Sequence, residues 1–469
     1  MNTSGFPMEL AMAGQVLLWL AVCAGFVLTR QASIYHPLTF YLGFHGIVFV
    51  VRPLLVYYLG FDAEFNYMQF EPSEAHLLRA LVASSIGLVV LSISTVAFGW
   101  TKIEFASPEP PLFTVEQKQA LAIVTVILIP IILYSVLSLL SGGLQVEDRG
   151  GTYVMVGASG YTIEAQVMAG SLICAWLAIT RFRWLAVAVI VPYVLYRSWA
   201  GMSRWTILLL FIAVSLVYAW QKRSKWPRAW TVLLMVPVLM LFHTIGQNRE
   251  YFQQILRGEE FRRGVNHPGA RLIDKWRTKY DGPDFANFDS LAFVAAVVPE
   301  RTGTYSYGAQ YLQLFTEPIP RKLWPEKPVG SPIRTFNLHN YGHFFGRTVS
   351  LVGDGWASGG YPGIVITMII AGLILGLGHR CFWTRQNSNM FSLSCLIFLA
   401  MLPQWFRDGG ISIAKFAFWN LSPLVLWAPM TWMIRGCRTR GYSVILPDGA
   451  RVRLITPAPG AIPNPGSQV

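Results

Sequence analysis

The sequence predicts an all-α polytopic membrane protein, and this interpretation rests on composition, on long apolar runs and on the distribution of charge. Of the 469 residues, 54% are hydrophobic and only 13% are charged, and the mean hydropathy is +0.45. Soluble domains carry about 25% charged residues. The 17 tryptophans and 19 tyrosines suit a chain that crosses the headgroup layer many times, because their amphipathic rings settle at that depth.

The apolar runs define the expected helices. A transmembrane helix needs about 20 apolar residues, and eleven runs approach that length: 9–28, 38–59, 77–100, 119–141, 163–180, 184–200, 205–221, 229–246, 361–378, 389–406 and 414–434. We therefore expect about 11 transmembrane helices, within a range of 10–13, because the fifth to seventh runs have short connections. The N-terminal MNTSGFPMEL has no basic n-region, so the first run is expected to remain as an anchor.

Lysines and arginines in short loops mark the cytoplasmic side. The strongest such signal is KRSKWPR, Lys222 to Arg228. Alternation from that loop places seven further cations and the tail segment 435–441 on the same side: Arg30, Lys102, Lys118, Arg181, Arg183, Arg380 and Arg385. The loop 61–76 on the opposite side has neither lysine nor arginine. The pattern predicts an N-terminus outside and a C-terminus in the cytoplasm.

This topology divides the chain into four parts. Residues 1–246 form an N-terminal bundle of about eight spans, and residues 247–355 form one large outer loop. Residues 356–434 supply about three more spans, and residues 435–469 form a cytoplasmic tail that is expected to be partly disordered, with a possible hairpin around Asp448-Gly449. Within the large loop, the apolar run 288–298 is too short to span, and suits an amphipathic helix that lies on the membrane or caps the bundle.

The sequence contains few groups typical of metal sites or of transport. The five cysteines are scattered without a CxxC pair, which argues against both a disulfide framework and a zinc site. Most span interiors are apolar, whereas transporters place ionisable residues near the midplane. Arg52, followed by Pro53, is the main exception, and it should face a partner or a ligand because an unpaired arginine is costly in lipid.

The large outer loop is basic and aromatic, and its most unusual stretch is EPIPRKLWPEKP, residues 317–328, here called the proline strap. Prolines at this density exclude helix and fix an extended or turn-like backbone. Arginine binds phosphate bidentately and aromatic faces pack on sugar rings, so the loop fits a lipid diphosphate that carries a glycan. Nucleic acid is not expected on this side of the membrane.

Several short motifs resemble the O-antigen polymerase (Wzy-type) family of oligosaccharide repeat-unit polymerases. They are GMSRW at 201–205, the long outer loop, YGAQYL at 307–312, IPRKLWPEKP at 319–328 and GDGWASGGYPG at 353–363. The resemblance covers roughly residues 200–380, and the rest of the chain only through topology. Eleven spans are fewer than is usual in that family.

The resemblance implies a metal-independent, GT-C-like glycosyltransferase without a cofactor. It would transfer a growing glycan from undecaprenyl diphosphate to the next lipid-linked repeat unit on the periplasmic face. Such an enzyme works in the bilayer on a lipid-linked donor and acceptor, with a chain-length regulator protein as a possible partner. Cations must stabilise the departing diphosphate, and a base must accept the proton of the attacking hydroxyl.

Candidate residues follow from position and residue type. For the base we select Asp354, which lies between two glycines before a span, and His343; His339, four residues earlier, is an alternative that could also share a metal with it. Asp354 could equally form a turn or a helix cap. Binding of diphosphate and glycan is assigned to eight residues: Arg197, Arg204, Arg249, Arg321, Trp324, Lys327, Arg334 and Arg347. Arg407-Asp408 is most simply an ion pair.

Three alternatives remain open. A ligase would move the glycan from the same carrier to a different lipid. A mannosyltransferase-like GT-C enzyme would place its catalytic acid in the first outer loop, at Asp62 or Glu64. An exporter of the lipid-linked glycan would need polar residues along a continuous path through the spans.

Overall fold

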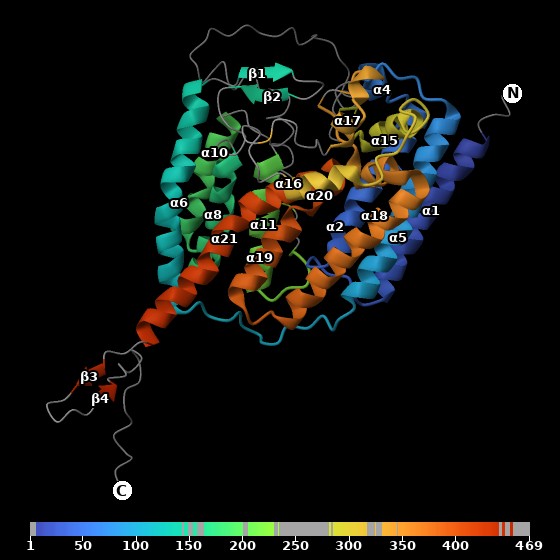
Figure 1. Cartoon of the computed structure of the whole chain (residues 1–469). Helices are drawn as coiled ribbons and strands as arrows, with labels where there is room; N and C mark the ends of the chain where they lie inside the picture. The colour runs from blue at the N-terminus through green and yellow to red at the C-terminus, as the bar shows by residue number, and fades with distance from the viewer. Residues whose placement is uncertain are drawn as a thin grey trace.

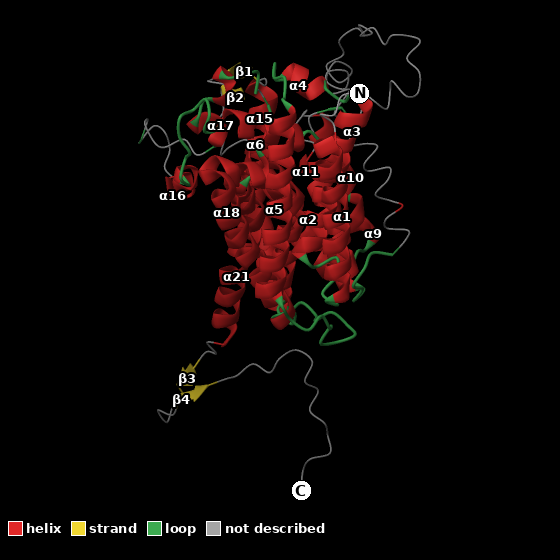
Figure 2. Cartoon of the chain, turned by 90° about the vertical axis from the view of Figure 1, so that its right-hand side faces the viewer, coloured by secondary structure: helices red, strands yellow, loops and turns green. Residues whose placement is uncertain are grey.

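The computed structural model describes residues 6–142, 145–148, 153–156, 164–199, 205–228, 233, 281–282, 285–316, 324, 331–344, 346–439, 443–445 and 451–453. Helices dominate this part of the chain, and they stack side by side as one elongated bundle (Figure 1). Figure 2 shows the same bundle from the side, with the C-terminal part of helix α21 (Gly410–Thr439) projecting from one end.

The first half of the bundle contains the N-terminal helices and α18. Its members are α1 (Phe6–Leu28), α2 (Pro37–His45), the π-helix η1 (Gly46–Val51), α3 (Arg52–Leu59), α5 (Glu74–Gly99) and α18 (Ser350–Thr384). Helix α5 begins at a capping box between Ser73 and His76, which satisfies two backbone donors. Helices α5 and α18 pack closely because glycines face each other, and a Cβ on Gly99 would lie only 3.1 Å from the Cα of Gly376.

Helix α18 is kinked near its start. Gly359 and Gly360 have non-helical backbone angles, with φ +64° at Gly360, a value that favours glycine. The carbonyls of Ala357 and Ser358 accept hydrogen bonds from the backbone of Ser306 and Tyr307. The kink therefore separates a short outer piece, which begins at Ser350, from the long apolar helix that follows.

The second half of the bundle contains the remaining long helices. They are α6 (Val115–Gly142), η2 (Ala165–Val167), α8 (Met168–Thr180), α9 (Trp184–Ala188), α10 (Ile190–Trp199), α11 (Trp205–Gln221), α19 (Asn389–Ala400), α20 (Leu402–Asp408) and α21 (Gly410–Thr439). Helix α21 packs against α6 and α8, and α11 packs against α8 and α19. Short helix α20 connects the halves, since it contacts α2, α18 and α21.

Helix α15 (Asn287–Val297) lies inside the bundle end rather than on a membrane surface. All eleven of its residues are buried, and it packs against α5, α18 and η1. The sequence analysis allowed this helix either to lie on the membrane surface or to cap the bundle. Its burial contradicts the first position and agrees better with the second. The reason is that NFDSLAFVAAV is apolar on every side after its first turn, so no polar face is left for water.

Around α15 lie short elements of the same bundle end: α4 (Ala63–Tyr67), η3 (Ala309–Leu312), α16 (Gln313–Thr316), α17 (Pro332–Thr335) and η4 (Leu338–Asn340) (Figure 1). Two antiparallel hairpins add the only strands of the described residues. One pairs β1 (Gln145–Asp148) with β2 (Tyr153–Val156), and the other pairs β3 (Ser443–Ile445) with β4 (Arg451–Arg453). The second hairpin confirms the one predicted for the tail, whereas the first was not predicted.

Six described helical segments are long and apolar enough to cross a membrane: residues 7–28, 37–59, 74–99, 115–138, 350–384 and 389–408. The expected spans at 163–180, 184–200 and 205–221 are helical but form shorter elements, and the expected eighth span lies outside the described residues. The all-α membrane class is therefore confirmed, and a total of eleven spans stays a prediction.

A further group of polar side chains lies inside the mostly apolar spans. A polar cluster lies between α1, α2 and α5, where Gln15 Nε2 is 2.9 Å from His45 Nε2 and donates to Ser84 Oγ at 3.2 Å. Ser85 donates to the Gln15 side-chain oxygen. The sequence did not indicate this cluster, because the hydropathy of the flanking apolar residues outweighs that of the amide, imidazole and hydroxyl side chains.

Candidate functional site

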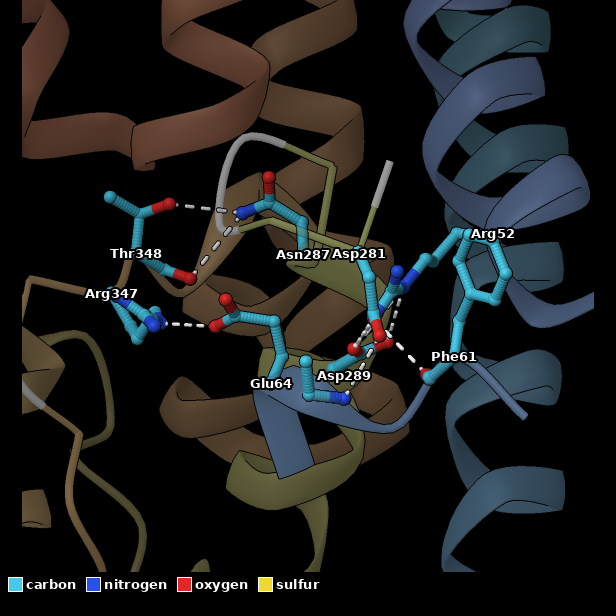
Figure 3. Close-up of polar contacts among 9 residues, drawn as sticks. Arg52, Phe61, Glu64, Asp281, Asn287, Asp289, Arg347 and Thr348 are labelled. Carbon is cyan, nitrogen blue, oxygen red and sulfur yellow. Dashed lines mark hydrogen bonds and ion pairs between the residues drawn. The ribbon is translucent and has the colours of Figure 1, made fainter. Parts of the chain in front are cut away.

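Charged and amide side chains gather at the bundle end that contains α15 and α4, which the loop charges assign to the outer side. We call this set the outer polar layer; among the described residues it comprises Arg52, Glu64, Arg197, Asp281, Asn287, Asp289, Arg347, Asp354, Arg407 and Asp408. Figure 3 shows part of it, with side chains from α3, α4 and α15 pointing toward one another.

Arg52 is the centre of the first group in the layer. Its Nη2 donates to Asp289 Oδ2 at 2.5 Å, to Asp281 Oδ1 at 2.9 Å and to the carbonyl of Phe61 at 3.3 Å, while its Nε lies 3.2 Å from both Asp289 oxygens (Figure 3). Arg52 and Asp289 are 1% and 0% exposed. The arginine thus faces partners, as expected, and it joins α3 to α15.

The two carboxylates of this group, Asp281 and Asp289, are buried beside Arg52. Burial raises the pKa of Asp289 to about 6, and Arg52 opposes that rise. Asp281 also accepts a hydrogen bond from the backbone of Ala63 at 3.2 Å. The hydrogen bonds of Arg52 are thus accepted by two carboxylates that it neutralises in part. This arrangement is typical of a structural ion pair more than of a catalytic site.

The second group pairs Glu64 of α4 with Arg347. The Arg347 Nε lies 2.5 Å from Glu64 Oε2, and the guanidinium stacks 3.8 Å from the ring centroid of Tyr67. Burial raises the pKa of Glu64, against the opposing effect of Arg347. His343 is exposed and its ring lies 4.7 Å from the Tyr67 ring, so the structure brings two predicted site residues together on one tyrosine.

The third group joins α15 to the rest of the layer. Asn287 Nδ2 donates to Thr348 Oγ1 at 3.0 Å and to the carbonyl of Arg407 at 2.9 Å. Arg407 forms the expected ion pair with Asp408 at 3.2 Å, and its guanidinium lies 4.9 Å from the ring of Trp205. Trp205, the one described residue of the GMSRW motif, thus lies beside α20.

Asp354 lies in the outer piece of α18 and is 2% exposed. Its Oδ2 accepts a hydrogen bond from the backbone N–H of Gly410 at 2.5 Å, where α21 begins. Gly409 precedes that contact with φ +90°, and a Cβ there would meet the Asp354 carboxylate. The catalytic role of Asp354 stays a prediction, and the geometry adds a structural role in fixing the start of α21.

Two of the motifs from the sequence contact each other. Gln310 of YGAQYL is fully buried, and its Nε2 donates to Ser358 Oγ at 2.6 Å and to the Asp354 carbonyl at 3.4 Å. Both acceptors belong to GDGWASGGYPG. Burial and the Asp354 carboxylate raise the pKa of Tyr311, which keeps its hydroxyl protonated. The motifs thus form one packed unit at the outer end.

Arg197 differs from the other arginines of the layer. It is 2% exposed near the end of α10, and its Nε and Nη2 donate to Thr206 Oγ1 at 3.0 and 2.7 Å. Its Nη1 is buried without a hydrogen-bond partner, and no carboxylate among the described residues forms an ion pair with it. Among the described residues, this buried cation therefore contacts a neutral hydroxyl and no anion.

Four predicted binding residues, Arg204, Arg249, Arg321 and Lys327, lie outside the described residues. Trp324 is 39% exposed, Arg334 is half-buried in α17, and His339 is half-buried in η4. Within the part of the chain that the structure describes, no cluster of three or more His, Cys, Asp or Glu residues could hold a metal.

Sequence reasoning missed three members of the layer, Asp281, Asn287 and Asp289. It also missed Thr206, the hydrogen-bond partner of Arg197. Asp289 had a usable signal, because it is the only charge in its apolar run and such a carboxylate must find a cation. Comparisons with models of known protein families, with curated proteins and with solved structures find no match to this chain.

Proposed function

We propose that the chain is a glycosyltransferase that polymerises polysaccharide at the outer face of the membrane. It takes a growing glycan from undecaprenyl diphosphate and transfers it to the next lipid-linked repeat unit. Its support is the motif resemblance, the packing of two of those motifs against each other, and above all the buried guanidinium of Arg197.

Arg197 is a buried cation whose charge has no described counter-ion. Removing a cation from water costs several kcal/mol unless a partner offsets the loss. Arg52, Arg347 and Arg407 each have a carboxylate partner, whereas the only partner of Arg197 within the part of the chain that the structure describes is Thr206. An anionic ligand would supply the missing charge and accept the hydrogen bond that Nη1 offers. A diphosphate has the required charge and the oxygen geometry for arginine.

The remaining site residues take roles around that anion. Arg204 and Arg249 would hold the diphosphate with Arg197, while Arg321 and Lys327 of the proline strap would approach it from above. Trp324 would pack on a sugar ring. These cations would do without metal what oxyanion donors do in other transferases, which is to stabilise charge that develops on the leaving group.

The test compares Arg197→Gln with Arg197→Lys and Thr206→Val in reconstituted membranes with lipid-linked repeat units. We expect Arg197→Gln to lower ladder formation at least about a hundredfold, as removal of one anion-stabilising donor does. The apparent Tm without substrate should stay the same or rise, because a buried unbalanced charge has been removed. Arg197→Lys should rescue poorly, since lysine lacks the bidentate fork.

Arg79→Gln is the matched control. Arg79 belongs to the same bundle end, but Glu300 already neutralises it at 2.6 Å, so ladder formation should change less than about twofold. If Arg197→Gln keeps normal activity, Arg197 does not hold the diphosphate. The same assay separates the alternatives: product only with a second lipid acceptor indicates a ligase, and translocation without transfer indicates an exporter.

A further inference from the structure

At the opposite end of the bundle lies a second basic site, which the proposed transfer reaction does not use. It is a groove of about 520 Å³ between residues 110–113, the start of α6, the ends of α8 and α11, and the turn before α9. Three cations line it, Lys118, Arg181 and Arg183. We call it the basic groove. Figure 1 shows the segment after α5 running along this end, away from α15 and α4.

The walls of the basic groove are held in place by specific contacts. Gln386 accepts from the backbone of Ala106 at 3.1 Å and donates to the carbonyl of Glu104 at 2.9 Å, and Asn389 donates to the carbonyl of Pro111 at 2.9 Å. Gln221 donates to the carbonyl of Ala178 at 2.6 Å. These bonds tie the 104–111 segment to α18 and α19, and α11 to α8, so the groove is part of the fold.

The charge of the groove is unbalanced. None of its three cations forms an ion pair within the described residues, although Glu109 and Glu116 lie on the neighbouring segments. Arg181 has φ +54° and forms the left-handed cap at the end of α8. Arg183 follows two residues later, and both arginines line the groove. Three cations therefore line one concavity together with the aromatic side chains of Phe113 and Trp220, and cations grouped in this way suit an anionic ligand.

Exposed apolar side chains at the same place identify the source of the anion. Leu112, which lines the groove, is 73% exposed, and Trp184 and Leu185, which directly follow Arg183 in the sequence, are 76% and 63% exposed. A soluble anion would leave these surfaces in water, whereas a phospholipid covers them with its acyl chains. Basic pockets between transmembrane helices on the cytoplasmic side bind acidic lipid headgroups, and tryptophan settles at that interface.

We propose that the basic groove binds the phosphodiester of an anionic phospholipid in the cytoplasmic leaflet, with the lipid chains lying along the exposed apolar side chains. The site is specific because it needs both the three cations and the adjoining apolar surface. It is independent of the glycan chemistry at the outer end.

The experiment measures retained lipid on the full-length protein by native mass spectrometry, after reconstitution with phosphatidylglycerol or cardiolipin in a phosphatidylcholine background. The groove variant is Lys118→Gln/Arg181→Gln/Arg183→Gln. The matched control is Lys222→Gln/Lys225→Gln/Arg228→Gln, which removes the same charge from the same end outside the groove. We expect the groove variant to lose anionic lipid at least about tenfold, since each basic residue near the surface contributes substantially, and the control to lose less than about twofold.

Three results would overturn the proposal. Equal loss in both triple variants would mean general surface attraction, and equal retention in wild type and groove variant would mean no lipid site. Displacement of the bound lipid by millimolar inorganic phosphate would make it a site for a free anion instead. Thermal unfolding in detergent shows whether both triple variants are folded. A groove variant that is folded and keeps its lipid counts against the proposal.

Discussion

Arg52 offers the sharpest test of the structure, because its role follows from geometry that the sequence did not contain. The perturbation is Arg52→Met, which keeps much of the side-chain length and removes the guanidinium. The variant leaves Asp281 and Asp289 without their cation, at 7% and 0% exposure. Removal of one partner from a buried pair typically costs about 3–5 kcal/mol, because the other charge stays buried and uncompensated.

The pH dependence of that loss has a definite sign. Burial already raises the pKa of Asp289 to about 6, against the opposing effect of Arg52, so loss of Arg52 raises it further. A folded pKa above the unfolded value means that the folded state binds more protons in the interval between them, and stability therefore falls as the pH rises through it. We expect Arg52→Met to recover part of its loss between about pH 7 and pH 5.

The assay is thermal unfolding of purified protein in detergent at a fixed heating rate, since unfolding of large membrane proteins is often irreversible. Arg52→Met should lower the apparent Tm by several degrees, and Arg52→Met/Asp289→Asn should regain part of it. Asp62→Asn is the control, because Asp62 is exposed beside the same group and should cost less than about 0.5 kcal/mol. An unchanged Tm in Arg52→Met, or a deeper loss at pH 5 than at pH 7, would refute the reasoning.

Three further predictions concern activity and stability at the outer end. Arg321→Ala and Arg249→Ala should each abolish long-chain product at normal expression, and Arg321→Lys should restore it poorly; unchanged chain length on a polyacrylamide gel would remove both residues from the site. Asp354→Asn weakens the hydrogen bond to the start of α21 and should lower the free energy of unfolding by about 1–3 kcal/mol, which thermal unfolding would show as a lower apparent Tm. If folding is unaffected while ladder formation stops, Asp354 is the base instead. Asp62→Ala and Glu64→Ala test an acid in the first outer loop, and full activity of both variants in the ladder assay would exclude that mechanism.

Much of the fold followed from hydropathy, because a helix in lipid must be both apolar and about 20 residues long. The described helices cover the expected runs from α1 to α6 and from α18 to α21. Local signals also located the hairpin of the tail, because the turn-forming pair Asp448-Gly449 lies in the sequence between the two segments that pair as β3 and β4. The hairpin of β1 and β2 was not predicted.

The candidate site was less predictable, because its contacts join residues far apart in the chain. Arg52 and Asp289 are separated by 237 positions, and hydropathy alone gives no distance between them. Each residue nevertheless carries the one formal charge of its apolar run, and two such charges of opposite sign could have been paired on electrostatic grounds. Arg197 and Thr206 are closer, but the turn between α10 and α11 had to be known before their contact could be inferred.

The structure also limits where the proline strap can act. The strap follows α16, which ends at Thr316, and α17 begins at Pro332 shortly after it. Both helices belong to the bundle end that contains α15, and α16 packs against α21. Apart from Trp324, the strap lies outside the described residues. The helices that flank it lie at the end of the bundle where Arg197 is buried without a carboxylate partner among the described residues. If the strap binds a diphosphate as we propose, that diphosphate lies at the same end as Arg197, and the substitutions at Arg197 and Arg321 then test a single anion site.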